Sequence, residues 1–262
     1  MNDLPYDVNQ LKDDLVQYCR AQLAFSGGER AVLGISGGKD SSVVAALLAE
    51  AVGPENVHGV LMPDGQQLDI DDAHALVAHL GIHEHLLPIG DITKTFYESL
   101  EKEAKLSQQT VLNLPPRVRM TVLFGLAQSL ENARVINTGN ISEDWVGYAT
   151  LYGDMAGAFA PLGMLTTDEV VAVGKALGLP AFLADKVPAD GLTGKTDEDV
   201  LGFSYAVLNR YIRTGEIDNP ETKEKIDRLH RISRFKFSPM PMFNPHFPIG
   251  ADDIAGIYKG VE

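Results

Sequence analysis

Residues 32–48 read VLGISGGKDSSVVAALL, a short apolar run followed at once by a turn of glycines, serines, one lysine and one aspartate. The apolar run is typical of a buried parallel strand. After the turn, apolar residues recur at helical spacing, at Val43, Val44, Leu47 and Leu48. The stretch therefore predicts a strand, a tight polar turn and a helix in direct succession, which is the first half of a βαβ unit.

Three further apolar segments are predicted strands, and helical patterns alternate with them along the chain. The strands are NVHGVLMP at 56–63, IHEHLLPI at 82–89 and ARVINTGN at 133–140. Strands that alternate with helices imply right-handed crossovers and one parallel sheet with helices on both faces. We therefore expect an α/β fold that forms a single domain over residues 1–262. Beyond the helix that follows the turn, the expected helices cover residues 8–25, 69–80, 115–130, 166–177, 197–212 and 221–234.

The composition is that of an ordinary globular protein with an acidic surface. Of the 262 residues, 45% are hydrophobic, and the formal net charge is −14. Such a charge repels nucleic-acid backbones, so we expect no nucleic-acid partner. The single cysteine, Cys19, excludes an intramolecular disulfide and fits a reducing cytoplasm. Neither a signal peptide nor a membrane-spanning stretch is visible, so we expect a cytoplasmic protein with no membrane partner.

The turn SGGKDSS at 36–42 has the composition of an oxyanion site. Gly37 and Gly38 let the backbone approach a ligand because neither carries a Cβ atom. The helix after the turn directs its free amides and the positive end of its dipole toward the same place. A phosphate group is the ligand that these donors favour. Further hydroxyl donors come from Ser36, Ser41 and Ser42.

Lys39 and Asp40 add one charge of each sign to the turn. Lys39 either supplies positive charge beside a phosphate or points to solvent. Asp40 fits beside an anion if it holds Mg²⁺, which takes one or two carboxylates together with phosphate oxygens. A plain glycine turn with a helix cap is the favoured reading of SGG alone, but the full SGGKDSS between a strand and a helix favours nucleotide binding. The spacings of the Walker A loop and of G-x-G-x-x-G are both absent from this turn.

The turn resembles the pyrophosphate loop of the N-type ATP pyrophosphatases, which cleave ATP between its α- and β-phosphates. Four further segments narrow the resemblance: PPRVRM at 115–120, NTGNISED at 137–144, YGD at 152–154 and PADGLTGKTDEDVLGFSYAVL at 188–208. In this order they are similar to segments of the NAD synthetases. The resemblance implies an adenine nucleotide alpha hydrolase-like fold, ATP and deamido-NAD and ammonia as substrates, and Mg²⁺ as cofactor.

The resemblance also implies which residues bind ATP and the metal. Asp40 and Glu143 would share the Mg²⁺, and Lys195 would stabilise charge on the leaving pyrophosphate. The alternative for Glu143 is an acidic residue that only favours a helix start, and for Lys195 a solvated loop lysine. The implied ATP contacts are Gly34, Ile35, Ser36, Gly37, Gly38, Lys39, Asp40, Ser41, Ser42, Met62 and Thr138.

For the acceptor substrate, the resemblance implies Arg117, with Arg234 and Lys236 as the nearest candidates toward the C-terminus. A surface arginine on a helix is the alternative for Arg117. The implied reaction adenylates the nicotinate carboxylate of deamido-NAD, and ammonia then attacks the acyl-adenylate. Ammonia is expected to come directly from solution, because the chain has no room for an amidase domain and Cys19 lies in an apolar helical pattern.

Four positions depart from the NAD synthetase pattern. Leu61, Leu151, Ala158 and Thr167 stand where these enzymes often carry charged residues. Two alternatives therefore remain beside amidation of deamido-NAD. One is an ATP-dependent amidating enzyme with a different carboxylate acceptor, and the other is a nucleotide-binding module that has lost turnover. The presence of both Asp40 and Glu143 favours an enzyme that retains turnover.

The resemblance finally implies a homodimer in which helices near PPRVRM pack across a two-fold axis. Val118, Val122 and Leu126 form an apolar stripe on the helix that begins with this segment. The stripe either serves as the interface between two copies or faces the sheet of its own chain.

Overall fold

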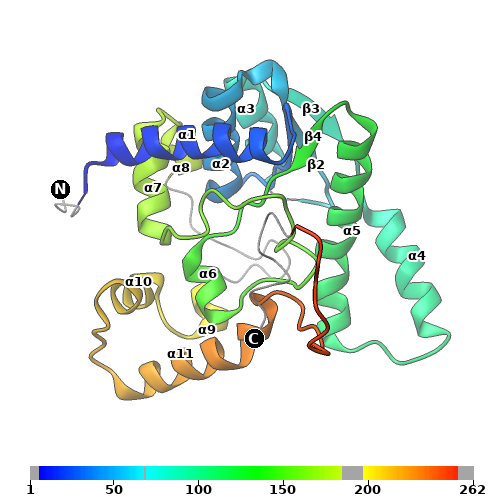
Figure 1. Ribbon diagram of the computed structural model, residues 1–262, viewed down its shortest axis with the longest axis vertical. Coiled ribbons are helices and arrows are strands. Elements are labelled where there is room, and N and C mark those ends of the chain that lie inside the picture. Colours follow the sequence, from blue (N-terminus) through cyan, green and yellow to red (C-terminus); the bar gives the residue numbers. More distant parts are fainter. Residues whose placement is uncertain (1–5, 68, 185–196, 253–262) are drawn as a thin grey trace.

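The computed structural model describes residues 6–67, 69–184 and 197–252. Within these residues, the centre of the fold is a four-stranded parallel sheet with the order β3-β2-β1-β4 (Figure 1). The predicted strands and their parallel arrangement are therefore confirmed. The strands are β1 (Arg30–Gly34), β2 (Val57–Leu61), β3 (His83–Leu86) and β4 (Ala133–Val135).

β1 is an interior strand, and its position brings the two polar turns together. Val32 pairs with His58 of β2 on one side and with Val135 of β4 on the other. The turn 36–42 follows β1, and the turn 137–144 follows β4. Because β1 and β4 are parallel neighbours, both turns leave the same edge of the sheet.

One face of the sheet is covered by helices that share the larger apolar core. The central member of this layer is α2, which begins directly after the turn and packs against β1, β2 and the other helices of the layer. Leu33 of β1 and Leu47 of α2 are fully buried in this core. The layer contains α1 (Val8–Phe25), α2 (Lys39–Val52), α3 (Ile70–Leu80), α7 (Thr167–Ala176), α8 (Ala181–Ala184) and the 3-10 turn η1 (Pro54–Asn56).

The opposite face is covered by α5 (Gln108–Ser129), with α4 (Gly90–Glu101) on its outer side (Figure 1). Val32 and Val60 of the sheet share a second apolar core with Leu123 of α5. Helices therefore cover both faces, as the alternating pattern predicts.

The start of α5 differs from the sequence prediction. We expect a helix from residue 115, because proline favours the first turn. The helix instead begins at Gln108, where the side chain of Ser107 accepts a hydrogen bond from the amide of Thr110 at 3.1 Å. The prolines at 115–116 lie inside the helix. The cap and the packing of Leu114 on the second core stabilise the early turns despite the hydrogen bonds that the prolines remove.

The apolar stripe on α5 faces the sheet of its own chain. Val118 is buried in the second core, and Val122 and Leu126 pack against that core. The stripe is therefore not available as an interface between two copies. Even α5, with 22 residues, lacks the hydropathy that a membrane span needs, and the same holds for the other described helices.

A third apolar core joins a group of helices beside α6 (Ile141–Val146). The sequence pattern predicts one helix over 197–212, but the structure divides it. Gly202 has φ of +75° and follows the last turn of the first helix, and Ser204 caps the second. The group contains α9 (Asp197–Leu201), α10 (Tyr205–Thr214), α11 (Pro220–Ser233) and the 3-10 turn η2 (Arg234–Lys236).

Candidate active site

The turn 36–42 is a tight loop whose backbone requires glycine at position 37. Gly37 has φ of +81°, and a Cβ atom placed on it would lie 2.4 Å from the backbone oxygen of Asp69. The loop therefore packs directly against the residue that precedes α3. The close approach that the glycine permits is an approach to the protein's own backbone.

The serines of this turn hold the loop in shape. The hydroxyl of Ser36 accepts a hydrogen bond from the amide of Gly38 at 3.1 Å and lies 3.1 Å from the hydroxyl of Ser41. The fully buried Ser42 donates to the carbonyl of Gly38 at 2.7 Å. Ser36 and Ser41 line the cavity described next, whereas Gly37 and Ser42 are not among its lining residues.

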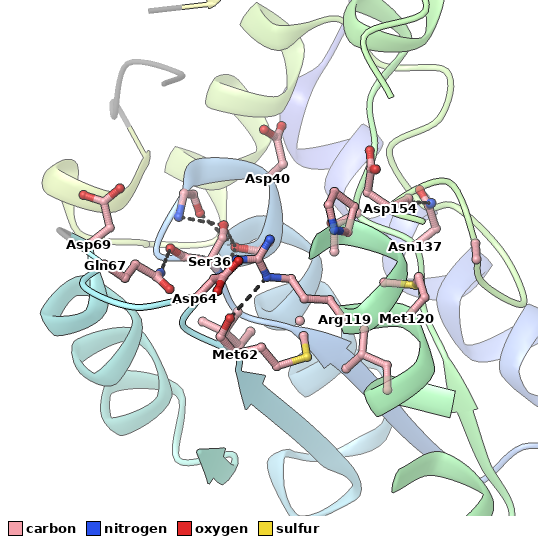
Figure 2. Close-up of a pocket in the computed structure, with 18 of the residues that line it drawn as sticks. Ser36, Asp40, Met62, Asp64, Gln67, Asp69, Arg119, Met120, Asn137 and Asp154 are labelled. Carbon is pink, nitrogen blue, oxygen red and sulfur yellow. Dashed lines mark hydrogen bonds between the residues drawn. The ribbon is translucent and has the colours of Figure 1, made fainter. Parts of the chain in front are cut away.

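A cavity of about 490 Å³ opens at the carboxyl ends of the central strands (Figure 2). Gly38 is the N-cap of α2 and has no side chain to occupy the amides of the first turn, so these amides can receive a phosphate. The cavity brings together most of the predicted ATP contacts. Those that line it are Gly34, Ile35, Ser36, Gly38, Lys39, Asp40, Ser41, Met62 and Thr138.

Lys39 is buried beside the acidic residues of the site. Only 4% of its surface is exposed, and its Nζ lies 2.8 Å from Oδ2 of Asp40. Burial by itself lowers the pKa of Lys39, but the charges of Asp40 and Glu143 outweigh it, so the pKa is raised. The alternative that this lysine points to solvent is therefore wrong.

Asn140 links the two polar turns, and the sequence reasoning did not single it out. Its Nδ2 donates to Oδ1 of Asp40 at 3.2 Å. Its Oδ1 accepts from the amides of Ser142 and Glu143 at 3.0 and 3.2 Å, so it is also the N-cap of α6. The sequence signal for this cap is an asparagine three residues before a glutamate at a helix start, in Asn-Ile-Ser-Glu.

Asp40 and Glu143 have the chemistry of a divalent-cation site. Burial raises the pKa of Glu143 well above its usual range, and the charge of Asp40 raises it further. A cation between two such carboxylates would relieve both effects. The described residues include no group of three or more acidic, histidine or cysteine side chains arranged to hold a metal. Phosphate oxygens and water would therefore complete the coordination, as is usual for Mg²⁺.

An apolar part of the cavity lining adjoins the loop at the end of β1. A Cβ atom on Gly34 would lie 3.2 Å from Cε of Met62 and 3.7 Å from Cδ1 of Leu123. Ile136 and Thr138, from the segment after β4, line the same cavity. Apolar side chains therefore form one wall of the cavity, as is usual for small-molecule sites, and Thr138 adds a hydroxyl to the lining.

The comparisons with known proteins agree with this arrangement. Residues 11–240 match the model of the family described as NAD synthase. The chain belongs to the NAD synthase family. It is 35% identical to an NH(3)-dependent NAD(+) synthetase from Archaeoglobus fulgidus, with 87% of this chain and 94% of the relative covered. The corresponding protein from Thermococcus kodakarensis is 38% identical, with 82% and 83% covered.

Solved structures of similar proteins support the same family. An NMN synthetase from Francisella tularensis has a TM-score of 0.84 and 30% identity, and 91% of this chain and 99% of that chain are covered. An NH3-dependent NAD synthetase from Campylobacter jejuni has a TM-score of 0.74 and 27% identity, with the same coverage. The predicted α/β fold of the NAD synthetases is therefore confirmed.

The three basic residues that the NAD synthase resemblance assigns to the acceptor lie outside the lining of the main cavity. Arg117 is exposed on α5, and its Nε donates to the carbonyl of Leu151 at 3.2 Å. Arg234 donates to the carbonyls of residues 144–145, and Lys236 to those of Gly147 and Ala149 at 3.0 and 2.8 Å. Arg117 and Lys236 therefore bond to the segment that follows α6, and Arg234 bonds to the end of α6 itself. Any contact of these residues with the acceptor would lie beside this part of the chain.

A smaller cavity of about 160 Å³ shares Glu143 with the main one. Asp144 and Asp154 both line it, and burial is the main reason that their pKa values are raised, to about 6 for Asp144. Oδ1 of Asp154 accepts from the amide of Thr150 at 2.9 Å. The sequence reasoning quoted Asp154 as part of YGD but gave it no role.

Asp197, the first residue of α9, belongs to the group of helices beside α6 and lies in the lining of the main cavity. It is 5% exposed and lines the cavity, and the hydroxyl of Tyr205 donates to its Oδ2 at 3.2 Å. Its charge contributes to the raised pKa of Glu143. The sequence segment TDED contains this residue, but spacing alone does not distinguish it from Glu198 and Asp199. Lys195, the predicted partner of the leaving pyrophosphate, lies outside the described residues.

Two of the four departures from the NAD synthase pattern are core positions in this chain. Leu61 is fully buried in the larger apolar core. Thr167 is 4% exposed, and its Oγ1 accepts from Nδ2 of Asn209 at 2.8 Å. Leu151 and Ala158 lie in the segment between α6 and α7: the Leu151 carbonyl accepts from Arg117, and the Ala158 amide donates to the carbonyl of Val135 in β4.

Proposed function

We propose that this chain catalyses the ATP-dependent amidation of deamido-NAD to NAD, with ammonia as the nitrogen donor and AMP and pyrophosphate as the other products. The observation that carries the proposal is the link between the two turns. Asn140 joins Asp40, beside the open amides of α2, to the first turn of α6, which contains Glu143. An anion-binding helix end and a carboxylate pair at one place suit the phosphates of a metal-bound nucleotide.

In the adenylation step, the carboxylate of the acceptor attacks the α-phosphorus of ATP. The bond from this phosphorus to the oxygen that bridges to the β-phosphorus breaks, and the electron pair leaves with pyrophosphate. The amides of the first turn of α2 hold the departing group, and Asp40 and Glu143 would hold Mg²⁺. When bound, Mg²⁺ neutralises charge on the phosphates. No proton moves in this step, so positioning and electrostatics supply the catalysis.

In the amidation step, ammonia attacks the carbonyl carbon of the acyl-adenylate, loses a proton and displaces AMP. The relatives named above are ammonia-dependent enzymes. Cys19 is fully buried, and burial raises the pKa of its thiol to about 12. It is therefore a core residue of α1, as the sequence pattern predicts, and not a nucleophile for glutamine.

A second candidate acceptor is the mononucleotide counterpart, deamidated NMN. The observation that favours it is the higher TM-score of the NMN synthetase, 0.84 against 0.74 for the ammonia-dependent NAD synthetase. The uncharged Leu151 accepts a hydrogen bond from Arg117 through its carbonyl, and the uncharged Ala158 lies in the same segment between α6 and α7. Fewer charged contacts in this segment suit a smaller acceptor.

The deciding experiment supplies ATP, Mg²⁺ and ammonium with either deamido-NAD or deamidated NMN in separate reactions. Equal amounts of NAD and AMP from the first reaction support the proposed function. A higher kcat/KM for the mononucleotide assigns the second acceptor. The absence of AMP in both reactions contradicts adenylation chemistry altogether.

We also propose that two copies associate through the outer surface of α4 and α5, since the Val118 stripe faces inward. Together, α4 and α5 carry six exposed apolar side chains, which such an association would cover. They are Ile92, Phe96, Leu100, Val111, Leu112 and Phe124, with exposed fractions from 39% to 49%.

A further inference from the structure

We propose that Arg119 binds the α-phosphate of ATP and stabilises the charge on it while the adenylyl group is transferred. The inference rests on the proposed function, because it concerns the same cavity and the adenylation step. Sequence reasoning assigned no role to this residue, although it lies two positions after Arg117 in PPRVRM.

Arg119 reaches from α5 across the end of the sheet and into the main cavity. Its Nε donates to the carbonyl of Met62, the residue that follows β2, at 3.2 Å. Figure 2 shows the guanidinium extending from α5 toward Ser36 and Asp64. The side chain is half-buried, and one hydrogen bond fixes its direction while leaving the other N–H groups toward the cavity.

Arg119 forms no ion pair with any carboxylate of the described residues. Asp64 and Asp154 are the acidic residues whose charges it feels. Oδ1 of Asp64 accepts a hydrogen bond from the hydroxyl of Thr93, a buried residue of α4, at 2.8 Å. This bond directs one carboxylate oxygen of Asp64 toward α4 and away from a tight pair with Arg119.

The charge balance of the cavity makes this cation important. Six described residues of the lining are acidic, and two are basic, namely Lys39 and Arg119. Lys39 is already paired with Asp40. ATP is itself strongly anionic, so it needs a positive group that the cavity's own carboxylates have not neutralised. The acidic residues are Asp40, Asp64, Asp69, Glu143, Asp154 and Asp197.

The position of Arg119 selects the α-phosphate. The apolar lining of Met62, Met120 and Leu123 suits the base, and the turn 36–42 suits the terminal phosphates. Arg119 is anchored at Met62 and extends toward Ser36 of that turn, between the two ends of the nucleotide (Figure 2). A guanidinium presents paired donors to the oxygens of one phosphate and keeps its charge at all working pH values.

The test compares Arg119→Ala and Arg119→Lys with a matched control, Arg20→Ala. Arg20 of α1 also donates its Nε to a single backbone carbonyl, that of Ala51, at 2.9 Å, but it does not line the cavity. Three quantities are measured: kcat for AMP formation, the Kd of ATP, and the exchange of labelled pyrophosphate into ATP with deamido-NAD present and ammonia absent. Exchange isolates adenylation from amidation.

We expect Arg119→Ala to lower kcat and the exchange rate by about 10²–10³-fold, with a smaller change in the Kd of ATP. Added guanidinium ions should restore part of the exchange in Arg119→Ala and none in Arg20→Ala, which a purely structural role of Arg119 would not produce. Arg119→Lys should retain part of the rate because it keeps the charge but not the paired donors. Arg20→Ala should keep the parent rates.

An exchange rate in Arg119→Ala equal to that of the parent overturns the inference. A change confined to the KM of the acceptor also overturns it, because Arg119 would then serve the acceptor. If Arg119→Ala does not fold, Arg119→Lys decides. A lowered exchange rate at an unchanged melting temperature supports the inference, and an unchanged rate ends it. If the parent itself forms no AMP with either acceptor, the proposed function fails, which is a different result from a failure of Arg119 alone.

Discussion

Nδ2 of Asn140 donates a hydrogen bond to Oδ1 of Asp40 at 3.2 Å, although the two residues lie 100 positions apart in the chain. The same side chain caps α6 through its Oδ1, so one amide group fixes both the carboxylate of the first turn and the helix that carries Glu143. The separation of the two candidate metal ligands therefore depends on a residue that needs no contact with a substrate.

Asn140→Ala should lower both stability and activity. Loss of the cap and of a buried hydrogen bond should cost about 1–3 kcal/mol of unfolding free energy, and misplacement of the carboxylates should lower kcat by about 10–100-fold. Asn219→Ala is the matched control, because Asn219 caps α11 through the amides of Glu221 and Thr222 far from the cavity. Urea unfolding and AMP formation are measured for both. Equal kcat values in the two variants would contradict the positioning role of Asn140.

Asp40→Asn and Glu143→Gln should each reduce AMP formation by about 10²–10³-fold, because each removes a charged ligand from one metal site. The double variant should be little worse than either single variant, since the first substitution already disrupts the site. Initial rates at saturating Mg²⁺ give the three values. Losses that add fully would show that the two carboxylates do not share one ion.

Gly37→Ala should weaken ATP binding by the loop, and this loss should come from a steric clash in addition to backbone strain. Its Cβ would lie 2.4 Å from the backbone oxygen of Asp69, so the loop must shift. Gly81→Ala is the matched control, because Gly81 has φ of +67° but no atom within 4 Å of the added Cβ. Both variants should lose about 1–2 kcal/mol of stability from the positive φ. ATP binding by calorimetry should weaken in Gly37→Ala only, and equal binding in both would show that the clash is relieved without cost to the site.

His58 should make the protein less stable in mild acid. Burial, followed by the charges of His83 and His85, lowers the pKa of His58 from 6.5 to about 4. The unfolded chain therefore binds a proton that the folded protein excludes between these values. The contribution of His58 is complete above the unfolded pKa of 6.5 and is lost as the pH falls toward 4, with a maximum loss of about 3 kcal/mol.

The measurement for His58 is the urea midpoint at pH 7.5 and at pH 4.5 in the parent and in His58→Asn. In the parent, Nδ1 of His58 lies 3.0 Å from Nε2 of His85. The asparagine keeps a polar group near this position, but its side chain does not titrate. The parent should lose more stability between the two pH values than His58→Asn. His79→Asn, at an exposed position of α3, should behave like the parent. The same pH dependence in all three proteins would contradict the assignment.

Phe96→Glu should dissociate the proposed pair of copies. Phe96 lies on α4 between Ile92 and Leu100, all on the outer surface, and is 49% exposed. A charge there would be buried without a partner in an interface. Light scattering at micromolar concentration should give twice the chain mass for the parent and the single mass for Phe96→Glu. Phe25→Glu, at an exposed position at the end of α1, is the control. A monomeric mass for an active parent would rule out the pair.

The strands and the position of the first turn could be predicted from the sequence, because they depend on local patterns of residues. The run before Ser36 is apolar throughout, and the turn chemistry after it is unusual enough to indicate a phosphate site. That this turn meets the one after β4 was implied by the family resemblance, because local patterns do not show that β1 and β4 are neighbours.

The features that could not be predicted from the sequence depend on contacts between segments that are distant in the chain. The start of α5 required the cap at Ser107 to outweigh the prolines at 115–116. Arg119 and Asp197 look like ordinary surface residues in their local patterns, and only the packing of α5 and of the helical group brings them to the cavity. The burial of Lys39 was likewise not predicted, because its surroundings include Glu143 and Asp197, which lie far away in the sequence.

The interior position of β1 also has a consequence for synthesis of the chain. β2 follows β1 closely and can pair with it early, but β4 is made about 100 residues after β1. Until β4 emerges from the ribosome, one edge of the central strand has no partner and offers its backbone to other chains. Closure of so long a loop is slow. Truncated or stalled products that end before Ala133 should therefore aggregate, and the finished protein should gain its nucleotide site only at the last strand pairing.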